Sequence, residues 1–236
     1  MPSVSIRAVN SRFTYTNKYP TTDVRSSLVA EYVFGSNQAA STPNAANSSV
    51  PLVLAASNTE AVVYGTNFAT VKNTAGFDTN ISLEYAGDYT VIQVTKNSLG
   101  AMGAKQDYFG TLSFQGRLCL YNSQHGDSNA VADLPVKSDS AFYFLAAKMP
   151  YAGKGKLYRY EGGALVTNEG ENNGGTRDTT KTWRIGSDVT GVAVIFSPVN
   201  IAYAAIYNRL LSDAEIAEVY QDVKNYLSKY RALVVS

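Results

Sequence analysis

The chain has 236 residues, 45% of them hydrophobic, and its 20 Lys and Arg residues nearly balance its 19 Asp and Glu residues. This length suits one large all-β or α/β domain or two small ones, and the near-zero net charge gives no general electrostatic reason to bind nucleic acid, acidic polymers or an anionic membrane surface. The single Cys119 and the single His125 exclude an internal disulfide framework and metal centres built from several cysteines or histidines.

The first 27 residues scatter apolar positions among Ser, Thr, Asn and Arg, which predicts an N-terminal arm over residues 1–27. The N-terminus is polar and lacks the apolar stretch of a signal peptide, so we expect synthesis without an export signal. No run of about 18 apolar residues occurs in the chain, which predicts that no helix spans a membrane.

Most of the remaining chain consists of short apolar segments. Residues 27–35 predict a strand that stops at Gly35, and the Ser-, Asn- and Ala-rich residues 36–49 predict a loop. Further segments, bounded by Gly, Asn, Asp, Ser or Pro, span residues 50–56, 61–64, 81–85, 89–95, 110–114, 117–121, 140–148, 156–160, 164–167, 182–186, 191–196 and 201–207. Many short strands with turn signals between them, and without helical segments between them, predict a β-sandwich or barrel.

The end of the chain changes its hydrophobic period. Ser212 to Glu215 has the form of a capping box, in which a hydroxyl and a carboxylate three residues later satisfy each other's backbone N–H groups. Apolar residues then recur every three or four positions from Ile216 to Leu227, which predicts an amphipathic helix that ends near Tyr230. We expect this helix to dock on the sandwich, and the alternative is that its outer face also contacts another chain.

Residues 206–216 read Ile-Tyr-Asn-Arg-Leu-Leu-Ser-Asp-Ala-Glu-Ile. This stretch resembles the last core strand and closing helix of LamG-like domains of the concanavalin A-like lectin/glucanase superfamily. Looser resemblance extends over about residues 28–220. It implies an all-β, concanavalin A-like jelly-roll sandwich of two antiparallel sheets with a C-terminal α-helix. The implied division of the chain is an arm over residues 1–27, the LamG-like sandwich over 28–211, and the helix and tail over 212–236.

Members of that family often carry Asp residues shortly before the Ile-Tyr pair, where they help to bind calcium. Ala202 and Tyr203 stand at these positions here, and neither side chain is a hard anionic oxygen ligand. We therefore expect neither a calcium ion at this site nor any other metal or cofactor.

The acidic residues do not support a glucanase. The glucanases of this superfamily use a Glu-x-Asp-x-x-Glu strand, whose alternation places the carboxylates on one face. Only Glu169 with Glu171 and Asp213 with Glu215 lie two residues apart. Neither pair has a third acid at the required spacing, and we predict that the protein is not an enzyme.

Sugar binding needs aromatic platforms beside fixed polar groups. The candidates are Tyr108, Tyr121, Asn122, His125, Tyr151 and Trp183. For any single one of the aromatic residues, packing in the core or on the sheet surface is favoured over ligand contact, and for His125 an ordinary exposed loop position is favoured. The polar residues 169–178 predict a solvated hairpin loop, with a weak calcium or sugar site as the alternative.

A lectin-like fold in a chain without an export signal suggests a protein that reaches the outside of cells by lysis. We therefore predict a structural or adhesive virion protein of a tailed bacteriophage, such as a capsid decoration, head-fibre or tail-associated protein. Its expected partners are other virion proteins or copies of itself in a homo-oligomer, with no nucleic acid. The alternative is a carbohydrate-binding module that recognises a bacterial surface glycan.

Overall fold

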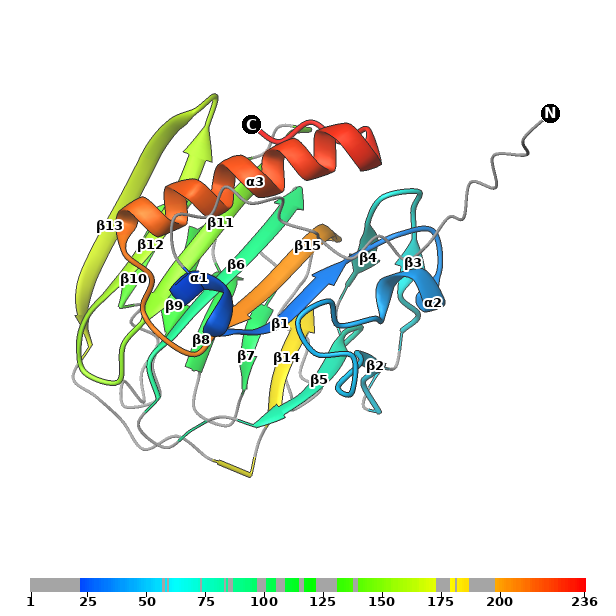
Figure 1. The fold of residues 1–236 in the computed structure, drawn as a ribbon, viewed down its shortest axis with the longest axis horizontal. Helices are drawn as coiled ribbons and strands as arrows, with labels where there is room; N and C mark the ends of the chain where they lie inside the picture. The colour runs from blue at the N-terminus through cyan, green and yellow to red at the C-terminus, as the bar shows by residue number, and fades with distance from the viewer. Residues whose placement is uncertain are drawn as a thin grey trace.

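The computed structural model describes residues 22–236 with several gaps, at 57, 59, 73, 83, 85–86, 97–100, 105–108, 115–116, 122–130, 138–139, 173–178, 181 and 187–197. In the described part, two antiparallel sheets stack face to face, and a long helix, α3 (Asp213–Arg231), lies across the outer face of one of them (Figure 1). This architecture confirms the predicted all-β sandwich with a C-terminal α-helix. None of the helices in these residues is long and apolar enough to cross a membrane.

The sheet under α3 has the order β13-β12-β11-β6-β15-β4-β3, and β1 also pairs with β15. Its described strands are β1 (Leu28–Val33), β3 (Val63–Tyr64), β4 (Ala69–Val71), β6 (Tyr89–Lys96), β11 (Phe142–Met149), β12 (Gly153–Glu161), β13 (Ala164–Asn172) and β15 (Val199–Tyr207). We call it the helix-covered sheet.

The second sheet has the order β10-β9-β8-β7-β14-β5-β2. Its described strands are β2 (Val53–Leu54), β5 (Phe77–Ser82), β7 (Ala101–Ala104), β8 (Phe109–Phe114), β9 (Arg117–Tyr121), β10 (Ala132–Pro135) and β14 (Thr182–Gly186). Two short helices, α1 (Thr22–Ser26) and α2 (Gln38–Ser41), flank β1 along the chain.

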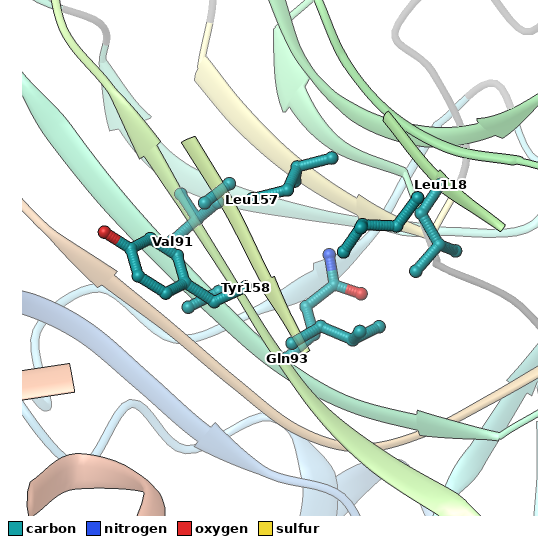
Figure 2. A pocket seen from close by; sticks show the side chains of 9 residues that line it. Val91, Gln93, Leu118, Leu157 and Tyr158 are labelled. Atoms are coloured by element: carbon teal, nitrogen blue, oxygen red, sulfur yellow. The ribbon is translucent and has the colours of Figure 1, made fainter. Parts of the chain in front are cut away.

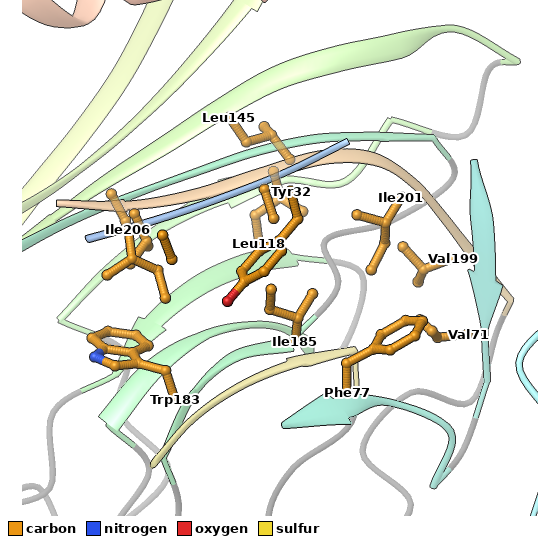
Figure 3. Close-up of a cluster of buried hydrophobic side chains, with 14 of the residues drawn as sticks. Tyr32, Val71, Phe77, Leu118, Leu145, Trp183, Ile185, Val199, Ile201 and Ile206 are labelled. Atoms are coloured by element: carbon orange, nitrogen blue, oxygen red, sulfur yellow. The ribbon is translucent and has the colours of Figure 1, made fainter. Parts of the chain in front are cut away.

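The main core fills the space between the two sheets. Figure 3 shows Phe77, Trp183 and Ile185 of the second sheet pointing toward Tyr32 and Ile206 of the helix-covered sheet. All five side chains are fully buried. The free energy of folding gained from burial is proportional to the apolar area that is removed from water. This large cluster is therefore the principal source of the stability of the fold.

A second core lies between the helix-covered sheet and α3. The central strands β6 and β15 are buried along almost their whole length, because one face contacts the main core and the other contacts the helix. In β6, Val91 points into the main core, while Ile92 and Val94 pack toward the helix. Coverage of both faces explains why these strands are apolar with little alternation.

The structure differs from the sequence predictions in several strands, and the predicted strand 191–196 lies outside the described residues. β5 spans Phe77–Ser82, where residues 81–85 were predicted. β4, β7 and β10 were not predicted, because Ala-Thr-Val, Ala-Met-Gly-Ala and Ala-Asp-Leu-Pro lack a run of large apolar residues. Residues 169–172, predicted to lie in a loop, belong instead to β13, where Glu169 and Glu171 flank the Nζ of Lys154 at 3.3 and 4.0 Å. Their carboxylates thus serve a cross-strand ion pair.

Part of the predicted N-terminal arm is also packed. Within α1, Val24 is 2% exposed and belongs to the core beneath α3. The carbonyl oxygen of Val24 accepts a hydrogen bond from the Ser27 hydroxyl at 2.9 Å, which ends the helix next to β1. Residues 22–27 are therefore part of the folded domain.

The edge strands β10 and β13 close one side of the sandwich. A Cβ atom at Gly170 would lie 1.7 Å from the carbonyl oxygen of Val131, so only glycine allows this approach. Nearby, the buried guanidinium of Arg159 donates to Glu161 at 2.6 Å and to the carbonyl oxygen of Pro135. Burial acts to raise the pKa of Glu161, but hydrogen bonds from Lys137 and Arg159 hold this pKa below its ordinary value.

The N-terminus of α3 has the predicted capping box. The Ser212 hydroxyl accepts from the Glu215 N–H at 3.2 Å, and the Glu215 carboxylate accepts from the Ser212 N–H at 2.6 Å. Arg209 adds a two-point ion pair to Glu215 at 2.6 and 3.0 Å. Together these bonds fix where the helix leaves β15.

The first helical residue, Asp213, joins the helix to β11 and β12. Its carboxylate accepts from Lys148 at 2.5 Å, Lys156 at 2.8 Å and the Tyr158 hydroxyl at 2.7 Å. Hydrogen bonds from Lys148 and Lys156 hold the pKa of Asp213 well below its usual range. The two acids that lie two residues apart here, Asp213 and Glu215, therefore anchor a helix and are not arranged as a catalytic pair.

Stability is expected to fall in acid through Glu215. The Arg209 hydrogen bonds lower the pKa of this carboxyl to about 2, below its ordinary value of about 4.3 in an unfolded chain. A depressed folded-state pKa contributes stability that is complete above the unfolded pKa and is lost as the pH falls toward 2. Urea unfolding followed from pH 6 to pH 2 should show this loss, and Glu215→Gln should show a shallower decline across the same interval.

Glu218→Gln is the matched control for that series, because Glu218 lies on the same helix and makes no ion pair with any residue in the described part of the chain. It should retain the acid dependence of the wild type. If the Glu215→Gln and wild-type curves run parallel between pH 4.5 and 2, the ion pair does not contribute as argued.

Candidate ligand site

Several of the side chains predicted to contact a ligand lie outside the described residues. Tyr108, Asn122 and His125 fall in segments that the structure does not describe, so their roles stay predictions. The backbone of Tyr121 ends β9, and its side chain is likewise not described.

The other two predicted residues are separated from each other. Tyr151 lies in the turn between β11 and β12, is partly exposed, and donates its backbone N–H to Asp88 at 2.7 Å. Trp183 is fully buried in the main core, where its ring packs against the ring of Tyr89 in a T-shaped arrangement with 5.0 Å between the ring centroids. A buried ring cannot offer a face to a sugar, which corrects the prediction of a Trp183 platform.

A small void lies between the sheets beside Gln93. It has about 10 Å³, which is room for one water molecule. Figure 2 shows the Gln93 amide lying among apolar side chains that include Val91, Leu118 and Leu157. This void is too small for any ligand larger than water.

A cavity of about 480 Å³ lies at the C-terminal end of α3. Its walls come from α1, the end of β1, the loop that follows α2, and the last turns of α3. The residues that matter for its chemistry are Arg25, Asn44, Ser48, Tyr226 and Arg231. This volume falls in the range of small-molecule sites, which is about 300–1,000 Å³. We call it the helix-end cavity.

Asn44 fixes one wall of the helix-end cavity. Its side-chain oxygen accepts hydrogen bonds from the backbone N–H groups of Glu31 and Ala46 at 3.0 Å and of Asn47 at 3.2 Å. Its amide group donates to the carbonyl oxygen of Val29 at 3.4 Å. These bonds tie the loop to β1, and they occupy the Asn44 side chain, so it positions the wall and leaves ligand contacts to its neighbours.

Arg231 brings a positive charge to the opposite wall. One of its guanidinium nitrogens would lie 3.3 Å from a Cβ atom added to Gly35, so a glycine at the end of β1 leaves room for it. Arg231 is partly buried and makes no ion pair or hydrogen bond with any of the residues that the structure describes. Arg25 lines the same cavity, and none of its described lining residues is acidic.

Two tyrosines of α3 stand beside these charges. Tyr226 lines the cavity and is 9% exposed, and its ring lies 5.3 Å from that of Tyr230. Tyr230 is 58% exposed, which makes it one of the most accessible large side chains of the domain. An exposed ring next to a polar cavity is the arrangement by which proteins contact the apolar face of a sugar.

Metal binding receives no support at the positions discussed above. Ala202 and Tyr203 are fully buried in β15, and the Tyr203 hydroxyl donates to the carboxylate of Glu31 at 2.9 Å. Among the described residues, no group of three or more His, Cys, Asp or Glu side chains could hold a metal ion.

No protein-family model matches the sequence, and neither does any curated protein. Solved structures do match its fold. The chain is similar to the binding domain of Paraclostridial Mosquitocidal Protein 1, with a TM-score of 0.59 and 11% identity over 86% of this chain and 53% of that one.

Two further solved structures share the fold. Botulinum neurotoxin type C, whose passage into cells depends on interaction with two ganglioside molecules, matches with a TM-score of 0.60 and 8% identity, over 85% of this chain and 52% of that one. Trypanosoma rangeli sialidase in complex with sialic acid matches with a TM-score of 0.53 and 16% identity, over 83% and 33%. The chain thus spans about half the length of the first two of these proteins and a third of the sialidase. At such identities the likeness shows the fold alone.

Proposed function

We propose that this protein is a non-enzymatic, lectin-like binding protein whose ligand is a carbohydrate held at the helix-end cavity. The observation that carries the proposal is the arrangement of Tyr226 and the exposed Tyr230 beside the Ser48 hydroxyl and two guanidinium groups. Aromatic rings suit the C–H faces of a sugar, and convergent polar groups suit its hydroxyls.

The fold likeness supports the same class of function. Two of the proteins named above are, respectively, a binding domain and a toxin that interacts with gangliosides, and the third is complexed with sialic acid. The acidic pairs of this chain, Glu169 with Glu171 and Asp213 with Glu215, are engaged in ion pairs on separate elements. Binding without catalysis therefore fits the described residues best.

The phage virion remains the proposed setting, as an inference from the sequence. A glycan-binding sandwich would there attach the particle to sugars of the bacterial surface. This part of the proposal rests on the LamG-like motif of residues 206–216.

Tyr230→Ala should weaken glycan binding by roughly tenfold or more without changing the fold, because a contact worth about 1.4 kcal/mol is lost from an exposed side chain. A glycan array with the purified wild type would first identify a ligand, and titration calorimetry with that ligand would give the affinity of each variant. The urea midpoint of Tyr230→Ala should match that of the wild type.

Tyr151→Ala is the matched control. Tyr151 is a tyrosine predicted from the sequence to bind a ligand. It lies in the turn between β11 and β12, the strands whose Lys148 and Lys156 contact Asp213 at the opposite end of α3. It should bind the ligand as the wild type does. Loss of binding in Tyr151→Ala with full binding in Tyr230→Ala would move the site to the β11–β12 turn, and the absence of any glycan ligand would refute the proposed function.

A further inference from the structure

We propose that the open edge of β13 is the surface through which two copies of this protein form a symmetric dimer. The paired segment is residues 164–168, which we call the open edge segment. The proposal names a surface for the homo-oligomer expected from the sequence, and it does not depend on glycan binding.

The first argument is the free side of β13. This strand is nine residues long and is the outermost strand of the helix-covered sheet (Figure 1). Within the described part of the chain it pairs with β12 alone, so no described strand lies along its second side. Gly170 approaches Val131 near the end of the strand, which leaves residues 164–168 as the accessible part. A row of backbone N–H and C=O groups on such an edge is a template for another strand.

The other sheet edges in the described residues are protected against such pairing. β2 and β3 are only two residues long, and β10 has four residues and ends in Pro135. The second side of β1 is bonded to a loop, because the N–H of Glu31 donates to Asn44 and its carbonyl oxygen accepts from Ala45. The open edge segment has no proline and no charged residue, and its Leu165 is 43% exposed. It therefore lacks the devices that keep edge strands from pairing.

The hairpin between β12 and β13 decides which backbone groups point outward. Both glycines of the turn at residues 162–163 have positive φ, 57° and 87°, as a type I′ turn requires. The flanking residues Glu161 and Ala164 then form the hydrogen-bonded pair that closes the hairpin. Because bonded and non-bonded pairs alternate along this regular register, the backbone groups of Leu165 and Thr167 point away from β12.

These outward groups make the segment complementary to itself. An antiparallel second copy centred on Val166 places Leu165 of one copy opposite Thr167 of the other, where their backbone groups exchange hydrogen bonds. The two Val166 side chains, which pack against the main core of their own copies, then face each other. Glu169 lies opposite Gly163 in this register, whereas a parallel in-register pair would set two Glu169 carboxylates side by side. An antiparallel second copy is therefore the partner that fits this edge.

Pairing at β13 leaves the helix-end cavity open. The strands β12, β11, β6 and β15 lie between β13 and β1, whose end lines the cavity. A dimer thus carries two accessible cavities, which raises its avidity for a surface that presents many copies of one ligand.

Sedimentation of the full-length chain over about 1–300 µM tests the proposal, because a short edge pairing forms a weak, concentration-dependent dimer. The wild type should shift from monomer to dimer across this range. Thr167→Pro removes an outward N–H that β12 does not use, so it should weaken association by roughly tenfold or more. Thr167→Val is the matched control, because it keeps the N–H and the preference for a strand, and it should associate as the wild type does. Urea midpoints close to that of the wild type would show that both variants are folded.

Cysteine cross-linking tests the register independently. Two Val166 residues in a non-hydrogen-bonded antiparallel pair have Cα atoms about 4.5 Å apart, within the range that a disulfide bridges. Asn168 lies opposite residue 164 of the other copy, which separates the two Asn168 Cα atoms by about 13 Å. Val166→Cys should therefore form a covalent dimer under mild oxidation and Asn168→Cys should not. The native Cys119 is buried in both variants.

Four outcomes would overturn the proposal. The first is a full-length chain that stays monomeric at every concentration. The second is a Thr167→Pro variant that dimerises like the wild type, since the interface would then lie elsewhere. The third is a monomeric chain that dimerises only after removal of residues 1–21, because the N-terminal arm of the same chain would then cover the edge. The fourth is equal cross-linking by Val166→Cys and Asn168→Cys, which a pairing centred on Val166 does not allow.

Discussion

Replacing Tyr220 by alanine should lower the free energy of unfolding by about 3–5 kcal/mol, the cost of truncating a large buried aromatic side chain. Tyr220 lies in the middle of α3 and is fully buried. Its ring stacks on the ring of Tyr160, with 3.8 Å between the ring centroids and an angle of 6° between the ring planes. It also packs against the ring of Phe144 in a T-shaped arrangement, with 5.4 Å between the centroids. Removing it leaves a cavity between the helix and β11 and β12.

Urea unfolding followed by circular dichroism and by tyrosine fluorescence measures this loss. Tyr220→Phe is the matched control, because it keeps the stacked ring and removes only the hydroxyl that accepts from Lys224 at 2.9 Å. That change should cost about 1 kcal/mol or less. Similar losses in both variants would mean that the hydroxyl, and not the aromatic packing, holds the helix.

The docking of α3 also decides whether the ligand site exists. Tyr226 and Arg231 belong to the last two turns of the same helix that Tyr220 holds at its centre. Asp213 fixes the first turn through Lys148 and Lys156. The helix thus connects an anchored end to a binding end, and loosening its middle should weaken ligand binding together with stability.

The sequence predicted well the elements whose pattern is local. Two predicted strands, 117–121 and 182–186, coincide with β9 and β14, and the helix boundaries follow from the capping box and the apolar period. β7 and β10 were missed because small or polar residues form strands there only when neighbouring strands supply hydrogen-bond partners. That information is tertiary and is absent from a local pattern.

The candidate site was much harder to predict. The same period that marked Tyr226 as buried could not show that the loop of residues 43–48 lies against it. Arg231 follows the last predicted helical turn, where a basic residue is ordinary, so nothing local distinguishes it. Trp183 shows why aromatic residues are weak site signals, because the same ring suits a sugar platform and a core, and the structure places it in the core.

Asn44→Ala should be the second most damaging change, with a loss of about 2–3 kcal/mol of stability and of most ligand binding. The side chain is 3% exposed, and its removal leaves the buried N–H of Glu31 without its acceptor, at a cost of about 1–3 kcal/mol. The N–H groups of Ala46 and Asn47 lie closer to the surface, where water can replace the lost bonds in part. The wall of the helix-end cavity would then no longer be tied to β1.

Asn47→Ala provides the comparison within the same loop. Asn47 is exposed, and among the described residues its side chain accepts only from the N–H and the hydroxyl of Ser49, at 3.1 and 2.7 Å. We expect it to lose less than about 1 kcal/mol and to bind the ligand normally. Urea unfolding and calorimetry on the two variants would separate positioning from direct contact. If Asn44→Ala loses binding while its stability stays at the wild-type value, Asn44 contacts the ligand itself, and its role in holding the wall is wrong.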